Sequence, residues 1–335
     1  MQDNPEDPNM TRRRLLRLVL TWALTAAIIT ALVYCVRNET ETFANLLTVN
    51  PINLALLIGV WVLLSIPRGL TRKLMARRLG VKLAFVDWYG LFMVTNLISL
   101  VVPARGDFII SAAYLKKKYG LPITQFGSMV YGNAVLLAAV LGLEGCLGLI
   151  LLGITENVWD LKIWGIVVTV GLGAIPFALL SNHILKGKNW LVKKLRAAIE
   201  GWESLRSDPG LLLRLVALIV MSSLIFTMWM YVSYRTLGFD VSIVPVFFAG
   251  VATQASFFFS LTPGNLGVRE AIVGFISQVI GLGFAEGIAV TILQRAVSTV
   301  VFFIFGGFFT LFVVGAFVNI GNEERVEDVH KGITK

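Results

Sequence analysis

The chain has 335 residues, of which 56% are hydrophobic and only 15% are charged, and its formal net charge is +9 at pH 7. This composition, with a mean hydropathy of +0.79, excludes an ordinary water-soluble domain and is typical of a multi-pass membrane protein. The basic residues flank apolar runs and form no nucleic-acid-binding motif, so nucleic acid is excluded as a partner.

The apolar runs divide the chain into predicted helices. In chain order they cover residues 15–36, 52–66, 83–102, 108–115, 123–154, 163–180, 211–234, 243–261, 271–284 and 287–318. We predict an all-α, polytopic membrane helix bundle with about six full spans and two re-entrant helical hairpins. Residues 1–318 form a single integral membrane domain in this interpretation, and residues 319–335 form a cytoplasmic tail.

The first apolar run reads as a retained helix, because it is about twenty residues long and lacks a small-residue cleavage pattern. Arg12, Arg13 and Arg14 precede it, whereas Glu39 and Glu41 follow it. The positive-inside rule therefore places the N-terminus in the cytoplasm. Continuing the count also places the C-terminus there, in a multi-pass protein of the cell (inner) membrane.

The basic segments predict the first hairpin. The segment after the second run contains six basic residues and no acidic one: Arg68, Arg72, Lys73, Arg77, Arg78 and Lys82. The next basic segment is Lys116 to Lys118, and a third occupies the loop 182–210. All three should be cytoplasmic. Residues 83–115 are too few for two full spans, which need about forty residues, so we predict a hairpin that enters and leaves on the cytoplasmic side.

A second break predicts a second hairpin, at residues 243–284, which enters from the outside. Its Pro263 lies 160 residues after Pro103 in the first break (263 minus 103). Two discontinuous segments that enter from opposite sides are the pattern of an inverted repeat, although the local sequence match between the halves is weak. Transporters of this design bind substrate where the repeats meet.

Both breaks end in charged residues. The first reads Pro103-Ala104-Arg105-Gly106-Asp107, and the second runs from Thr262 to Glu270 as TPGNLGVRE. Charge at bilayer depth costs a few kcal/mol per residue, and broken backbone is tolerated there only against protein or water. The two breaks therefore predict a polar site inside the membrane.

These motifs resemble those of the lysylphosphatidylglycerol synthase transmembrane, or flippase-like, family. The resemblance lies in the stretch from Ser260 to Glu270, in Gln294-Arg295 of the last span, and in the looser first motif from Asn96 to Leu115. It covers the chain from the first helix to Val318. It implies a domain that binds a lipid with a charged headgroup and moves it across the cytoplasmic membrane.

The chain departs from the family pattern at two places in its first half. Asp107 stands where the family usually has Glu, and Gly132-Asn133 stand where it usually has an acidic-basic pair. The identity of the lipid or of a coupling ion is therefore open.

Guanidinium groups bind phosphate through two parallel hydrogen bonds, so the intramembrane arginines are the candidate headgroup ligands. The candidates in each role are as follows: for headgroup binding, Arg105, Arg269 and Arg295; for charge pairing or proton coupling, Asp107, Glu144 and Glu270; for the hairpin backbone, Pro103, Gly106, Pro263, Gly264 and Gly267; for lining the cavity, Asn96, Thr253, Gln254 and Asn265. The alternative is that each arginine pairs with Asp107, Glu270 or Glu144 only to hold the hairpins together.

The leading hypothesis is a flippase or lipid-binding transporter for a lipid with a phosphate-containing or polyprenyl-linked headgroup. We expect no cofactor, no metal and no catalytic residue, because the two histidines are isolated and no phosphate-binding loop or metal-ligating acidic pair is present. The alternatives are an integral membrane transferase and an accessory subunit that partners a lipid or glycolipid synthase.

Overall fold

The computed structural model describes residues 49–100, 106–157, 202–259, 262 and 265–313, with residues 30, 46, 159 and 200. Regular secondary structure in these ranges is entirely helical, which confirms the predicted all-α membrane fold class. Four of the described helices are long and apolar enough to span a membrane: Pro51–Arg78, Ile123–Thr155, Pro209–Thr236 and Phe284–Val313. The expected spans 15–36 and 163–180, the tail 319–335 and most of the loop 182–210 lie outside the described residues.

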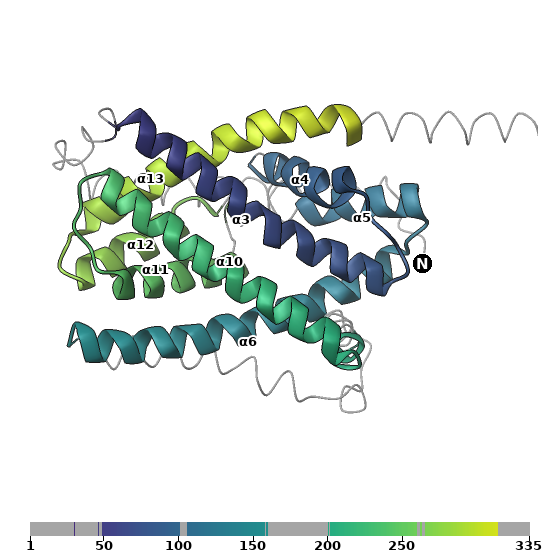
Figure 1. Cartoon of the computed structure of the whole chain (residues 1–335), viewed down its shortest axis with the longest axis horizontal. Helices are drawn as coiled ribbons and strands as arrows, with labels where there is room; N and C mark the ends of the chain where they lie inside the picture. The colour runs from purple at the N-terminus through teal and green to yellow at the C-terminus, as the bar shows by residue number, and fades with distance from the viewer. Residues whose placement is uncertain are drawn as a thin grey trace, which may run out of the picture.

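The described helices form two sets with the same order (Figure 1). The first set contains α3 (Pro51–Arg78), the π-helical turn η1 (Val86–Gly90), α4 (Leu91–Ser99), α5 (Gly106–Tyr119) and α6 (Ile123–Thr155). The second contains α10 (Pro209–Thr236), α11 (Ile243–Ala255), the 3-10 turn η2 (Ser256–Phe259), α12 (Val268–Val279), α13 (Phe284–Val301) and the π-helical turn η4 (Phe302–Gly306), after which helix continues to Val313.

The first helices of the two sets are alike. Helices α3 and α10 each have 28 residues and each begin with proline, after an Asn50 or Asp208 side chain that accepts a hydrogen bond from the first turn. They pack against each other and run in opposite directions. In Figure 1 the pair α4 and α5 lies at one end of the bundle, and the pair α11 and α12 lies at the other. Each pair of short helices flanks one predicted break.

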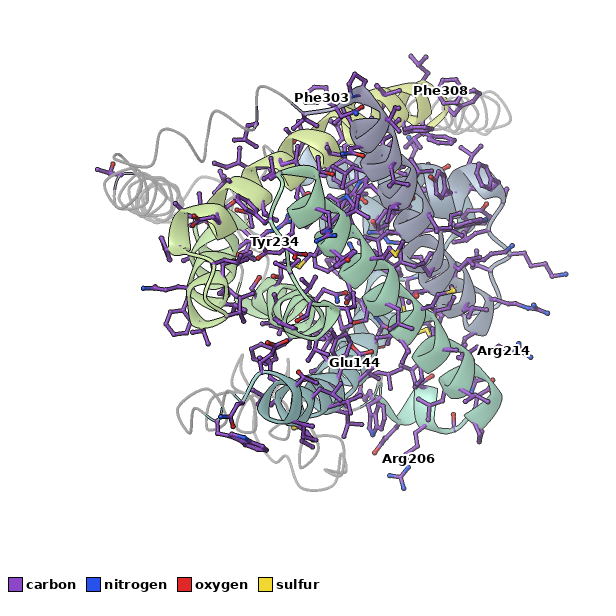
Figure 2. The ribbon with its side chains drawn as sticks, turned by 60° about the vertical axis from the view of Figure 1, so that its left-hand side comes forward. Glu144, Arg206, Arg214, Tyr234, Phe303 and Phe308 are labelled. Carbon is purple, nitrogen blue, oxygen red and sulfur yellow. The ribbon has the colours of Figure 1, made fainter. Side chains whose placement is uncertain are left out.

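An aromatic cluster marks the crossing of α3 and α10. The ring centroids of Trp61 and Trp229 are 4.3 Å apart, and Phe302 packs edge-on against Trp61 at 5.7 Å. Large apolar side chains on the outer surface stay exposed instead, among them Phe303 (62%) in η4 and Phe308 (56%) in the helix after it, which Figure 2 shows at the rim of the bundle. Lipid acyl chains are the natural solvent for such residues, so the outer surface fits a bilayer.

Close packing holds α12 against α13. A β-carbon added at Gly287 would lie 2.6 Å from the Cα of Gly274 and 2.5 Å from the Oγ of Ser277. Only glycine allows the two backbones to approach so closely, as is usual where small residues line a helix interface in membranes.

Helix α3 extends further than the sequence predicts. The apolar run ends at residue 66, and Arg68 and Arg72 were expected in a cytoplasmic loop, yet both lie inside α3. The helix continues because arginine, lysine, leucine and methionine favour helix, and Gly80, with a φ of 82°, follows its end. The guanidinium of Arg72 donates to Thr95 (3.1 Å) and Ser111 (3.3 Å), so it connects α3 to α4 and α5.

The buried carboxylate of Asp87 joins the start of the first hairpin to the end of α5. Asp87 is fully buried and accepts hydrogen bonds from Tyr114 (2.6 Å), Lys118 (2.5 Å) and Tyr119. Burial alone raises the pKa of Asp87, but the hydrogen bonds and the charge of Lys118 outweigh it and hold that pKa below its usual range. Burial beside this carboxylate raises the pKa of Tyr119 to about 12, so the tyrosine remains a donor.

We therefore predict that Asp87→Asn destabilises the protein by about 3 kcal/mol at neutral pH, since it removes the charged partner of three donors. A carboxylate with a lowered pKa stabilises the fold above its unfolded pKa, and the contribution is lost as the pH falls through the folded value. The difference in melting temperature between wild type and variant should accordingly shrink below about pH 4. Thermal unfolding in detergent across pH measures it, and a pH-independent difference would contradict the role of the charge.

Candidate functional site

Two arginines from opposite halves of the molecule pack on the aromatic cluster. Arg68 of α3 lies 5.8 Å from the ring centroid of Trp61 and 5.6 Å from that of Phe226, and Arg269 of α12 lies 5.5 Å from that of Trp229. Aromatic faces stabilise cations at such distances, most strongly away from water. The crossing of α3 and α10 therefore holds two positive charges on one shared apolar surface.

A third guanidinium and a carboxylate adjoin them. Arg295 of α13 donates to one carboxylate oxygen of Glu270 through both Nε (3.0 Å) and a terminal nitrogen (2.6 Å). The other oxygen of Glu270 accepts from the backbone N–H of Gly267 at 2.7 Å and caps α12. Gly267 has a φ of 84°, which favours glycine. The motif thus folds its own carboxylate into the start of α12.

Arg269 is held by neutral groups. Its side chain is buried, with 7% exposure, and donates to the amide oxygen of Gln294, whose nitrogen in turn donates to Ser233 at 3.1 Å. The Nε of Arg269 has no hydrogen-bond partner in the described part of the chain. Arg68 and Arg295 lie close enough for their charges to repel Arg269, and Glu270 is the acidic group that offsets this repulsion. We call the four residues Arg68, Arg269, Glu270 and Arg295 the arginine cluster.

A row of hydrogen bonds leads from the arginine cluster to Glu144. Arg68 donates weakly to the oxygen of Gln254 (3.5 Å), the nitrogen of Gln254 donates to Ser223 (3.2 Å), and Ser223 hydrogen-bonds to Glu144 on α6. Figure 2 shows Glu144 where α6 passes beneath α11 and α10. The Oε2 atom of Glu144 is buried and has no partner among the described residues. The neutral side chains of Gln254 and Ser223 thus lie between the cation Arg68 and the carboxylate Glu144, and the four residues come from four helices.

The structure separates the other predicted residues into three groups. Arg105, Pro103, Pro263 and Gly264 lie outside the described residues, and Gly106 and Asp107 begin α5, where the side chain of Asp107 is not described. Asn96 and Thr253 each donate to a carbonyl four residues earlier in their own helices. Asn265 adopts a φ of 56° and donates to Ser256 at 2.8 Å, while its buried Oδ1 has no partner in the described ranges.

Arg68 is the residue that the sequence analysis missed. The hydropathy pattern assigns Arg68 to a loop, but a helix that continues through residue 78 places Trp61, Ser65, Arg68 and Arg72 at i, i+4, i+7 and i+11. That spacing, on a face that includes a tryptophan, is the signal that would have predicted an inward-facing arginine.

We predict that Glu270→Gln destabilises the fold by about 2 kcal/mol, because it leaves Arg295 without its anionic partner in a buried site. The matched control is Asp240→Asn, which removes the exposed ion pair with Arg235 and should cost less than about 1 kcal/mol. Thermal unfolding of both variants in the same detergent compares them. Equal losses of stability in the two variants would mean that the Glu270–Arg295 pair contributes no more than an exposed ion pair.

Comparison with known proteins identifies the family. The family model described as Lysylphosphatidylglycerol synthase TM region matches residues 15–306, which include both hairpins and the whole arginine cluster. Neither a curated protein nor a solved structure matches the chain. The extent of the match, the all-α membrane fold and the motif that caps α12 agree, and the chain therefore belongs to the lysylphosphatidylglycerol synthase transmembrane-region family.

Proposed function

We propose that the protein binds the phosphate-bearing headgroup of a membrane lipid between its two halves and moves it across the membrane, while the acyl chains stay in the bilayer. The observation that carries this proposal is the charge imbalance of the arginine cluster, which has three guanidinium groups and one carboxylate. Excess positive charge at this depth is costly unless an anion joins it. A phosphate supplies that anion and accepts several donors at once.

The position of the cluster supports a transported ligand rather than a static one. Arg68 belongs to the first half, whereas Arg269 and Arg295 belong to the second, and the aromatic rings beneath them come from both. In transporters built from inverted repeats, alternating access arises when one repeat moves against the other around such an interface. The family match supports lipid handling at the level of a membrane domain linked to lipid synthesis or flipping.

The charges at the two ends of the bundle support the predicted orientation. Basic residues gather where α3 and α5 end and α10 begins, and include Lys73, Arg77, Arg78, Lys116, Lys117, Lys118, Arg206 and Arg214. The opposite end carries Glu156, Asp240 and Glu286. By the positive-inside rule the first end is the cytoplasmic one, so the first hairpin opens toward the cytoplasm and the second toward the outside.

We predict that Arg269→Gln reduces the amount of phospholipid that stays bound to the purified protein at least tenfold, because it removes a charge-assisted contact to phosphate. Native mass spectrometry in mild detergent measures the retained lipid and its headgroup. The matched control, Arg235→Gln, removes an exposed arginine in the last turn of α10 that pairs with Asp240, and it should retain lipid as wild type does. Equal retention in all three proteins would remove Arg269 from the site.

A second prediction concerns transport. In liposomes that contain NBD-labelled phosphatidylglycerol, wild-type protein should accelerate exchange of the label between leaflets, measured by its accessibility to dithionite. Arg68→Gln and Arg269→Gln should each slow the exchange at least tenfold, whereas Arg269→Lys should retain part of it because lysine keeps the charge without the fork. Size-exclusion profiles and melting temperatures verify folding. Wild-type rates in both glutamine variants would refute the proposed site.

A further inference from the structure

A second basic site lies at the end of the bundle, away from the arginine cluster. A pocket of about 370 Å³ opens between the C-terminal turns of α3 and the first turns of α10. It is lined by three arginines, one aspartate and small or apolar residues: Leu74, Arg77, Arg78, Asp208, Gly210, Leu211 and Arg214. None of the proposed transport residues lines it.

The charges of this pocket are unbalanced. Three guanidinium groups face one carboxylate, and Asp208 already accepts a hydrogen bond from the backbone N–H of Leu211 at 3.0 Å, where it caps α10. Arg78 donates to the hydroxyl of Ser207 at 3.2 Å, which holds it beside the pocket. No ion pair to these arginines occurs within the described ranges. The pocket therefore presents a net positive charge and free donors.

The pocket also meets the lipid-facing surface. Leu213, next to Arg214 in the second turn of α10, is 71% exposed, and Leu74 and Leu211 form the apolar part of the lining. Both α3 and α10 are candidate membrane spans, and the pocket lies at their ends. Arginines at the ends of spans reach the headgroup region, where each attracts anionic lipid. Donors and apolar surface thus occur at the depth where a phosphate and its acyl chains join.

We propose that this pocket is a binding site for the phosphate of an anionic lipid headgroup, separate from the arginine cluster. The guanidinium groups of Arg77, Arg78 and Arg214 bind the phosphate, and the apolar lining contacts the start of an acyl chain. The site holds a lipid of the leaflet on the basic side and connects α3 to α10, the two helices that cross at the centre of the molecule.

The experiment titrates full-length protein in neutral detergent with dioctanoyl phosphatidylglycerol and measures the dissociation constant by microscale thermophoresis. Arg214→Gln should weaken binding about fivefold. Asp208→Asn should strengthen it about threefold, because asparagine keeps the cap of α10 but removes the only carboxylate among the lining residues. The gain of affinity is informative because a misfolded variant cannot produce it.

The matched control is Arg206→Gln. Arg206 is exposed at the same end of the bundle (Figure 2) but does not line the pocket. Its removal should leave the dissociation constant unchanged. In an Arg269→Gln background, Arg214→Gln should still weaken lipid binding by the same factor. An equal loss in Arg206→Gln and Arg214→Gln, or no gain in Asp208→Asn, would overturn the proposal. Titration with inorganic phosphate at matched ionic strength distinguishes a lipid headgroup from free phosphate as the ligand. If inorganic phosphate binds as tightly as the lipid, the assignment to a headgroup is overturned.

Discussion

A guanidinium group inside a bilayer is stable only where protein groups or an anion replace its water, and this requirement organises the described bundle. Arg68 and Arg269 find that replacement on the rings of Trp61, Phe226 and Trp229, which exist as one surface only because α3 and α10 cross there. Neither half of the chain supplies the whole surface. The antiparallel packing of the halves is therefore a condition for burying their charges.

The same constraint explains how a broken backbone survives in such a hydrophobic chain. The turn before α12 hydrogen-bonds to Glu270, whose other oxygen bonds Arg295 of the next helix. One carboxylate thus satisfies both the backbone of the break and a cation of the neighbouring span. The charged motif therefore supports the fold and also supplies charge. Pairing inside the protein and binding of a phosphate headgroup are thus compatible roles for its arginines. Arg295 is held by Glu270, whereas the hydrogen bond that Arg269 makes in the described part of the chain goes to the neutral Gln294.

The sequence predicts the fold class and the order of the long helices well, because length and hydropathy decide which segments can span a bilayer. It also singles out Glu270 and Arg295, which the structure pairs, because charged residues are rare at that depth. It fails at Arg68, because a hydropathy window ends at the first arginine and does not show that the helix continues to residue 78 with Arg68 facing the bundle interior. It also cannot predict that Gln254 and Ser223 join Glu144 to Arg68, because these contacts connect four helices far apart in the chain.

The two tilted indoles in contact at the crossing have a consequence of another kind. Trp61 belongs to one half and Trp229 to the other, and their centroids are 4.3 Å apart. The coupling between the electronic transitions of two indoles in contact varies steeply with their separation and tilt. Any rocking of one half against the other must alter this geometry, so the protein carries an intrinsic optical reporter at the centre of the interface where its two halves meet.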